Sequence, residues 1–177
     1  MVKFRNIPRF TDGGHYKVNM AWEDLENTLT RYANRGQGLG GLDMDPDFQR
    51  GHVWTREKQI AYVEYIIKGG NSSKDIYFNN PTWQGSYKAD TILVDGKQRI
   101  AAALAFLHNE IPAFGHYYRE YEDSLPTHVD FVFHINELKT RKEVLQWYLD
   151  LNSGGVVHTD EELNKVRRLI EAENGNG

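Results

Sequence analysis

One junction constrains the fold more than any other part of this sequence. An apolar run at residues 91–94 ends in Asp95-Gly96 and passes at once into a helical pattern at residues 98–108. The glycine lets the backbone turn sharply between the two elements. The chain must therefore place the N-terminus of a helix directly at the end of a strand, which requires a fold that combines sheet and helices.

Strand-like and helical stretches alternate along the rest of the chain. The patterns predict strands at residues 16–20, 76–78, 91–94 and 129–135, and helices at 22–35, 56–68, 98–108 and after the capping boxes Thr140/Glu143 and Thr159/Glu162. The expected buried stripes of the later helices are Ile60, Val63 and Ile67; Ile100, Ala103, Leu104 and Leu107; Val144, Tyr148 and Leu151; and Leu163, Val166 and Ile170. We predict one α+β domain at residues 15–172, with a small mixed sheet and four or five helices. A flexible arm (1–14) and a flexible tail (173–177) are expected to flank it.

Composition excludes several classes of function. The chain of 177 residues has no cysteine, which excludes a disulfide framework, a thiolate zinc site and a cysteine nucleophile. Its longest apolar run, residues 100–107, is far shorter than the roughly 20 residues of a membrane helix. No secretory leader is evident at the N-terminus, so we expect a cytoplasmic protein without a membrane partner. The net charge of −4 argues against general nucleic-acid binding but leaves a local basic patch open.

The junction at Asp95-Gly96 is also the strongest candidate for chemistry. Backbone N–H groups at a helix N-terminus favour phosphate, and Lys97 and Arg99 lie in the first turn, where cations are unfavourable for the helix alone. We expect an external anion to offset them. Asp95 could hold a divalent ion or orient a water. The alternative is purely structural, with Asp95 capping the helix and Gly96 serving the turn.

A second cluster centres on Gln49 and Arg50. Phe48, Val53 and Trp54 around them are typical buried anchors, so the two polar side chains would stand on a rigid turn. An arginine held in this way can make bidentate contacts to phosphate or carboxylate. The alternative for Arg50 is an ordinary surface ion pair.

Other motifs are weaker. Tyr117, Tyr118 and Tyr121 with Arg119 could stack on bases or could pack a loop on the core. The seven histidines include no H-x-x-x-H pair, and neither a Walker loop nor a G-x-S-x-G elbow is present.

Three motifs in order carry a resemblance to a known family. They are F-Q-R-x-x-V-W (Phe48, Gln49, Arg50, Val53, Trp54), D-G-x-Q-R (Asp95, Gly96, Gln98, Arg99) and L-N-S-G-G (Leu151 to Gly155). This order resembles the N-terminal domain of GmrSD-type restriction endonucleases, a family with the ParB/sulfiredoxin fold. The resemblance implies nucleotide binding and hydrolysis that feed a nuclease or DNA-sensing activity in restriction and phage defence.

Carried over by position, the resemblance places Asp95, Gln98 and Arg99 in the nucleotide site as catalytic residues, with Gln49 and Arg50 facing the nucleotide and Asn152 and Ser153 closing the site. The helix start adds Gly96, Lys97 and Arg99 as phosphate-binding residues, and it adds Asp95 as the residue that would hold Mg²⁺. Lys97 stands where the family's D-G-Q-Q-R motif has its first Gln, a change expected to alter the base or phosphate preference or to mark a loss of hydrolysis. Val156 stands where a Thr commonly follows Gly-Gly.

The sequence leaves three functional hypotheses. The first is a stand-alone domain that binds a nucleoside triphosphate and acts as a slow Mg²⁺-dependent NTPase. The second is a non-catalytic module that contacts DNA, an effector nuclease or another protein of a restriction or anti-restriction system. The third, a direct nuclease, requires a metal-bound carboxylate set that local spacing does not assemble. We do not expect this chain to carry the C-terminal H-N-H effector that is usual in the family.

Overall fold

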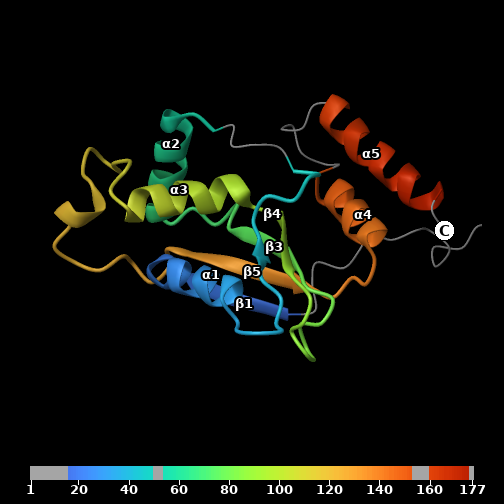
Figure 1. Cartoon of the computed structure of the whole chain (residues 1–177). Coiled ribbons are helices and arrows are strands. Elements are labelled where there is room, and N and C mark those ends of the chain that lie inside the picture. The colour runs from blue at the N-terminus through green and yellow to red at the C-terminus, as the bar shows by residue number, and fades with distance from the viewer. Residues whose placement is uncertain (1–15, 50–53, 153–159, 176–177) are drawn as a thin grey trace, which may run out of the picture.

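A five-stranded mixed sheet forms the centre of the computed structural model, which describes residues 16–49, 54–152 and 160–175 (Figure 1). The strands are β1 (Tyr16–Ala21), β2 (Leu42–Asp43), β3 (Asp75–Asn79), β4 (Thr91–Asp95) and β5 (Asp130–Asn136), in the order β1-β5-β3-β4-β2. β1 is antiparallel to β5 and β3 to β4, whereas β3 is parallel to β5 and β2 to β4. The predicted α+β class with a mixed sheet is confirmed.

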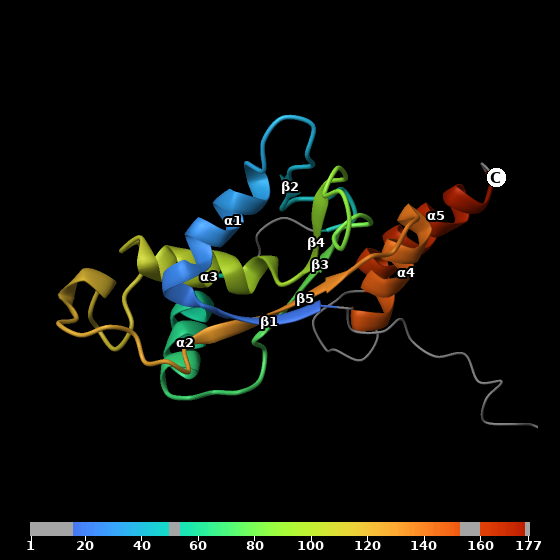
Figure 2. The ribbon, with the colours of Figure 1, turned by 90° about the horizontal axis from the view of Figure 1, so that it is seen from below.

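Helices cover both faces of this sheet. They are α1 (Leu25–Ala33), α2 (Arg56–Ile67), α3 (Lys97–Leu107), α4 (Arg141–Asn152) and α5 (Asp160–Gly175), with short 3₁₀ helices at Trp22–Asp24 and Tyr118–Glu120. Figures 1 and 2 show α4 and α5 side by side, away from α1, α2 and α3. The helices therefore form two groups, with the sheet between α1–α3 and α4.

Alternate residues of the strands divide the core into two clusters. Phe78 and Leu93 point to the cluster formed with α1, α2 and α3, while their neighbours Tyr77 and Val94 belong to the cluster formed with α4 and α5. Val166 of α5 is almost fully buried in the second cluster. The two clusters fix the position of α4 and α3 relative to β4, where the polar residues of interest lie.

The buried face of α2 differs from the predicted stripe. Of Ile60, Val63 and Ile67, only Val63 is fully buried, and the other buried side chains are Tyr62 and Ile66. Nearly every position between 60 and 67 is apolar or aromatic, so the sequence permits several stripes. Packing against α3 and the sheet selects the one that includes Tyr62.

The buried face of α3 is also wider than predicted. Ile100 and Ala103 are buried as expected, but Leu104 and Leu107 are only partly buried, and Ala102, Ala105 and Phe106 are buried in their place. The reason is that α3 packs both on α2 and on the sheet core, so that it has no single apolar stripe. Small alanines allow this close approach on two sides.

Side chains cap α2 and α4, and the cap of α4 is the predicted Thr140/Glu143 box. Thr55 Oγ1 accepts a hydrogen bond from the N–H of Lys58 at 3.3 Å, which caps α2. At α4, the N–H of Glu143 donates to Thr140 Oγ1 at 3.2 Å, and the N–H of Thr140 donates to Glu143 Oε2 at 2.9 Å. The hydrogen bonds that Thr140 donates to the Glu143 carboxylate hold the pKa of Glu143 below its usual value. The Thr159/Glu162 box lies outside the described residues.

The tyrosine-rich loop packs on the core. The rings of Tyr118 and Tyr121 lie 5.5 and 6.2 Å from that of Phe106, and the Tyr121 hydroxyl donates to the carbonyl of Ala113 at 2.6 Å. Of the two alternatives for this loop, stacking on bases or packing on the core, Tyr118 and Tyr121 follow the second.

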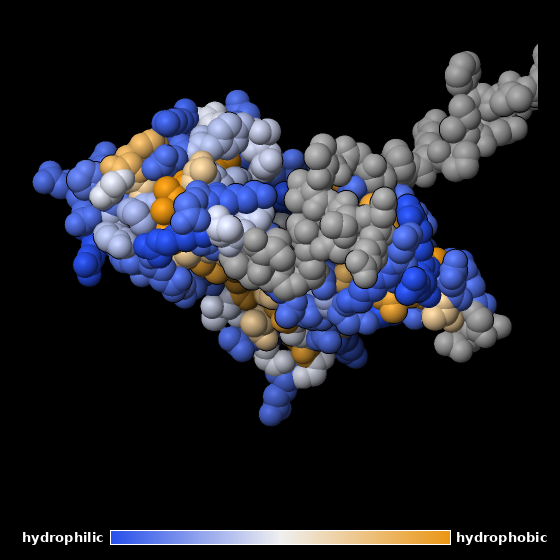
Figure 3. All heavy atoms as spheres, turned by 90° about the horizontal axis from the view of Figure 1, so that it is seen from above, coloured by the Kyte–Doolittle hydropathy of each residue, from blue (hydrophilic) through white to orange (hydrophobic). Residues whose placement is uncertain are grey.

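Helix α5 reaches into the range predicted as a tail, residues 173–177. Helix α5 continues to Gly175, past residue 172, and Glu173 forms an ion pair with Arg141 at 3.4 Å. The predicted arm, residues 1–14, lies outside the described residues. Within the described ranges, no helix is long and apolar enough to cross a membrane. Figure 3 shows one face of the molecule as mainly hydrophilic, with apolar atoms in small separate groups.

Candidate functional site

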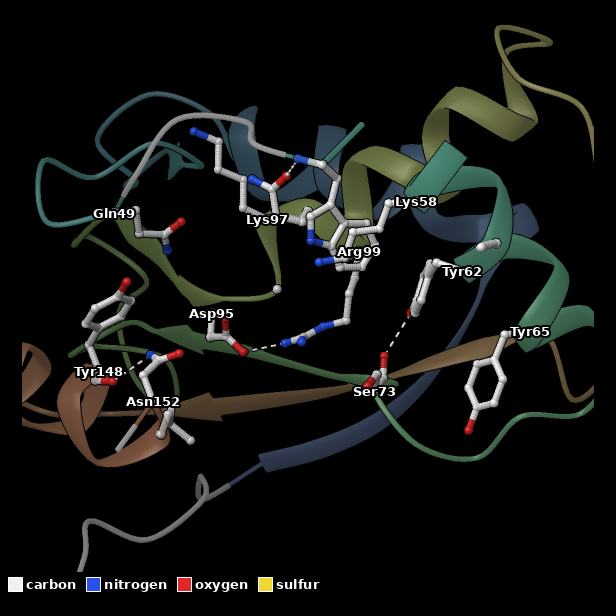
Figure 4. Close-up of a pocket in the computed structure, with 15 residues that line it drawn as sticks. Gln49, Lys58, Tyr62, Tyr65, Ser73, Asp95, Lys97, Arg99, Tyr148 and Asn152 are labelled. Carbon is white, nitrogen blue, oxygen red and sulfur yellow. Dashed lines mark hydrogen bonds and ion pairs between the residues drawn. The ribbon is translucent and has the colours of Figure 1, made fainter. Parts of the chain in front are cut away.

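A cavity of about 570 Å³ lies at the end of β4, between α2, the start of α3 and the end of α4 (Figure 4). It contains parts of all three sequence motifs. The candidate residues that line it are Gln49, Asp95, Gly96, Lys97, Gln98, Arg99 and Asn152. The fold thus brings together in one cavity residues that are up to 103 positions apart (152 − 49) in the chain. The other two candidates, Arg50 and Ser153, lie outside the described residues.

The junction between β4 and α3 requires glycine for two reasons. Gly96 has φ +114°, a backbone conformation that side chains with a Cβ rarely adopt. A Cβ at this position would also lie 2.5 Å from Cδ1 of Ile76 on β3. Gly96 therefore lets α3 begin immediately at the end of β4 and close to the neighbouring strand.

No side chain caps the N-terminus of α3. Gly96 is the capping residue, and its carbonyl accepts the first helical hydrogen bond, from the N–H of Ile100 at 3.0 Å. The alternative in which Asp95 caps the helix is wrong, because no side-chain cap is present and the Asp95 carboxylate accepts from Arg99 Nη2. The N-terminus of α3 thus adjoins the cavity without a carboxylate cap, and such an end favours an anion.

Both cations of the first turn have carboxylate partners within the chain. Arg99 pairs with Asp95, and Lys97 pairs with Asp45 in the segment after β2. These two carboxylates already balance the cations, and the external anion expected from the sequence stays a prediction. The two pairs are not equivalent, because the side chain of Asp45 is 73% exposed and that of Asp95 only 29%.

The described residues do not build a metal site by themselves. No group of three histidine or acidic side chains able to hold a metal ion occurs among residues 16–49, 54–152 and 160–175. Asp95 is a single carboxylate that is already paired with Arg99. Mg²⁺ commonly binds through one or two carboxylates together with substrate phosphates. The Mg²⁺ assigned to Asp95 from the sequence would therefore have to arrive with a phosphate ligand.

Hydrogen bonds to the main chain hold three amide side chains around the cavity. Gln49 Nε2 donates to the carbonyl of Leu93 on β4, and Asn152 Nδ2 donates to the carbonyl of Tyr148 at 2.7 Å. Gln98 Oε1 accepts from the N–H of Trp54 at 3.1 Å, which ties the start of α2 to the start of α3. These hydrogen bonds fix the direction in which each amide faces.

Sequence reasoning did not assign the aromatic wall of the cavity to the site. Trp54 and Tyr62 pack edge to face, with ring centroids 5.2 Å apart, and the Lys58 ammonium lies 5.0 Å from the centroid of the Trp54 ring. The Tyr62 hydroxyl donates to the carbonyl of Ser73 at 2.8 Å, and burial raises the pKa of Tyr62 well above its usual value. Lys58 and Ser73 also line the cavity.

Tyr65 stands at the outer end of the same wall. Its side chain is held by a hydrogen bond of 2.5 Å with Ser72 Oγ, although the residue is 42% exposed. This hydrogen bond lowers the pKa of Tyr65. The signal in the sequence was the i, i+3 spacing of Tyr62 and Tyr65, which places both rings on one face of a helix.

Comparison with known families identifies the domain. Residues 29–129 match the family described as GmrSD restriction endonuclease, N-terminal domain. The chain belongs to this family. Membership associates the chain with restriction and phage defence. The matched residues include Gln49 and the β4–α3 junction but not α4, which supplies Tyr148 and Asn152 to the cavity.

We found no match among curated proteins or solved structures. The narrower assignment to the ParB/sulfiredoxin fold therefore stays a prediction, while the α+β class stands on the structure itself.

Proposed function

We propose that this GmrSD N-terminal-type domain binds a nucleoside triphosphate in the cavity at the start of α3, as part of a restriction or phage-defence system. The observation that carries the proposal is that residues of three separate sequence motifs line one cavity at an uncapped helix N-terminus. Its volume lies in the range of about 300–1,000 Å³ that is typical of small-molecule sites.

The walls of the cavity match the parts of a nucleotide. Lys58, Lys97, Arg99 and the N–H groups at the start of α3 offer charge and donors to phosphates. The rings of Trp54, Tyr62 and Tyr65 offer surfaces for a base. A single cavity with both kinds of wall is suited to a ligand that is anionic at one end and aromatic at the other.

The ion pairs at the site do not oppose this binding strongly. An exposed pair such as Lys97 with Asp45 is worth about 0–1 kcal/mol, so a polyphosphate can take over Lys97 at little cost. Arg99 can keep Asp95 as its partner and still present its remaining nitrogens, since a guanidinium has five N–H donors.

Hydrolysis is the finer part of the proposal. Asp95 ends β4 directly before α3 and lines the cavity, where a carboxylate can orient a water toward a bound phosphate. Gln98 holds the start of α2 in place, and Arg99 supplies positive charge to the phosphate. Mg²⁺ would enter with the triphosphate and reduce its charge.

The test is thermal stabilisation of the purified protein by ATP, GTP, CTP and UTP, with and without Mg²⁺. A ligand at 100 times its dissociation constant stabilises a protein by about 2.7 kcal/mol, which raises Tm by several degrees at this size. Lys97→Met should reduce the shift, while Lys17→Met on the exposed strand β1 should not. Phosphate release by wild type and Asp95→Asn then tests hydrolysis. Absence of any shift with all four nucleotides would refute the proposal.

The family supports a second candidate, a non-catalytic module that contacts DNA or an associated nuclease. The family is named after restriction endonucleases, which act on DNA. The basic and aromatic rim of the cavity at Lys58 and Tyr65 can also stack on an unpaired base. Binding of single-stranded or duplex DNA that falls steeply with salt, and weakens in Lys58→Met, would favour this candidate. Co-purification with a nuclease of the same restriction system would support the protein-binding version.

A further inference from the structure

We infer that the nucleobase of the bound nucleotide stacks on the ring of Tyr65, and that this contact favours purine over pyrimidine nucleotides. The inference rests on the proposed nucleotide binding and deepens it, because it assigns the base to one of the three rings that line the cavity. Figure 4 shows Asp95 and Arg99 on one side of Tyr62 and Tyr65 on the other. The base would therefore lie at the end of the cavity away from the β4–α3 junction.

The other two rings of the aromatic wall are already engaged within the protein. Tyr62 is only 8% exposed and stacks on Trp22, with ring centroids 6.3 Å apart and planes inclined by 28°. Trp54 packs against Tyr62 and carries the Lys58 ammonium over its ring, 5.0 Å from the centroid. Tyr65 lines the same cavity and is 42% exposed. It is thus the ring of this wall with the most surface to offer a ligand.

One face of the Tyr65 ring is packed on the main chain at Gly70. A Cβ placed on Gly70 would lie 2.4 Å from both Cε1 and Cζ of Tyr65 and 2.6 Å from Cδ1. A point in the ring plane outside the ring cannot be so nearly equidistant from three consecutive ring atoms, so this position lies over the face of the ring. Glycine at position 70 therefore lets the chain support one face of Tyr65, which leaves the opposite face for a ligand.

Hydrogen bonds then fix the ring in this place. The Tyr65 hydroxyl shares a hydrogen bond of 2.5 Å with Ser72 Oγ and accepts another from the N–H of Ser72 at 3.2 Å. The N–H of Gly70 donates to the carbonyl of Tyr65 at 2.9 Å, which holds the supporting turn against the helix. An exposed ring that is already immobilised loses little conformational entropy when a ligand binds. Because its hydroxyl is engaged with Ser72, Tyr65 offers the ligand its ring face.

A free aromatic face suits the flat part of a nucleotide, which is the base. Stacking of a base on an aromatic side chain is strong and tolerates every base, because each base has a π-face. A purine has two fused rings and covers more of Tyr65 than a pyrimidine can. The same geometry therefore predicts a preference by size, with ATP and GTP bound more tightly than CTP and UTP.

The test compares wild type with Tyr65→Leu by calorimetric titration with ATP, GTP, CTP, UTP and tripolyphosphate in the presence of Mg²⁺. Tyr65→Leu should weaken binding of the purine nucleotides about 5- to 150-fold, the range for loss of one stacked base, and of the pyrimidine nucleotides less. Tripolyphosphate has no base, so its affinity should not change. Tyr65→Phe keeps the ring and should lose less than Tyr65→Leu. Tyr16→Leu, at a tyrosine of β1 that is 44% exposed, is the matched control and should leave all affinities unchanged.

Gly70→Ala tests the support of the ring without removing the ring. The new methyl group must displace Tyr65, so nucleotide affinity should fall while tripolyphosphate affinity stays the same. Gly70→Ala should add little to the loss in Tyr65→Leu, because both variants remove the same contact. Additive losses would show that Gly70 acts on binding by another route and would contradict its role as a support.

Four results would overturn the inference, in whole or in part. If wild type binds nucleotides and Tyr65→Leu binds them equally well, the proposed function stands and the stacking on Tyr65 does not. Equal losses for all four nucleotides would overturn the purine preference. If Tyr65→Leu weakens binding of a single-stranded adenine oligonucleotide but not of ATP, the ring serves an unpaired DNA base instead. If neither tripolyphosphate nor any nucleotide binds to wild type, the proposed function fails together with this inference.

A folding defect is separable from loss of the ring. Circular dichroism and the affinity for tripolyphosphate report on the fold of Tyr65→Leu. The wild-type series decides without any variant, because a base that stacks must make nucleotides bind more tightly than tripolyphosphate, and equal affinities would contradict stacking.

Discussion

The guanidinium of Arg141, at the start of α4, binds both carboxylate oxygens of Asp47, at 3.0 and 2.7 Å. From α5, Lys165 Nζ donates to the main-chain carbonyl of Asp47 at 2.8 Å. Asp47 belongs to the turn that carries Gln49 into the cavity. The last two helices thus hold the turn on which one of the proposed ligand-binding amides stands.

Arg141→Gln should therefore weaken nucleotide binding without unfolding the protein. Both side chains of the pair are more than 40% exposed, so the loss of stability should be about 1 kcal/mol or less. Affinity should fall about two- to fivefold, equivalent to at most about 1 kcal/mol, as Gln49 becomes less well placed. A double-mutant cycle with Asp47→Asn checks this, because the combined variant should be no worse than either single one. If the effects of Arg141→Gln and Asp47→Asn on affinity are additive, this ion pair does not act on the site through the turn that carries Gln49.

The same pair should make stability depend on pH under acidic conditions. The hydrogen bond from Arg141 lowers the pKa of Asp47, so its folded value lies below the unfolded value of about 3.9. A carboxyl group with a lowered pKa contributes stability above its unfolded pKa and loses it as pH falls through the folded one. Urea unfolding at a series of pH values from about 5 downward should show this loss below about pH 4, and a smaller loss in Asp47→Asn. If the free energy of unfolding falls equally with pH in wild type and Asp47→Asn, Asp47 makes no such contribution.

Gly96→Ala should be strongly destabilising. The strained φ and the contact with Ile76 together should cost about 2–5 kcal/mol. Gly38→Ala is the matched control, because Gly38 also has a positive φ, +77°, but no atom lies within 4 Å of its Cβ position. In chemical unfolding, the free energy of unfolding of Gly96→Ala should therefore be well below that of Gly38→Ala. Ile76→Val removes the nearest atom, Cδ1, so the double variant with Gly96→Ala should regain part of the lost stability. Equal losses of stability in Gly96→Ala and Gly38→Ala would contradict the steric explanation.

The features that could be predicted from the sequence are those decided by near neighbours along the chain. The Thr140/Glu143 cap and the turn at Gly96 depend on residues within about one helical turn, and both are present. The family motifs predicted that Gln49 and Asn152 belong to one site, and the two residues line one cavity although 103 positions separate them.

The rest of the site depends on contacts between distant segments. Lys97 meets Asp45, 52 residues away, and nothing in the local pattern around Lys97 reveals that partner. Tyr62 was assigned to no face because residues 60–67 of α2 are nearly all apolar or aromatic, and packing against α3 decides which rings reach the cavity. The sequence therefore predicts the polar residues of the β4–α3 junction and the amides Gln49 and Asn152 better than the aromatic wall of the cavity or the ion pairs within it.

Asp45→Asn should increase affinity for nucleoside triphosphates. Asp45 forms an ion pair with Lys97, so a phosphate bound at Lys97 must share the ammonium group with Asp45 or displace the Asp45 carboxylate. Removing this exposed competitor should tighten binding about two- to fivefold, because such a pair is worth at most about 1 kcal/mol. The gain should shrink as salt rises from 0.05 to about 0.5 M, since the interaction is exposed to screening. Asp123→Asn, which removes the same charge from the loop before β5, is the control for net charge and should change affinity little. Equal gains in both variants would mean that only overall charge matters, and no gain in Asp45→Asn would place the phosphates away from Lys97.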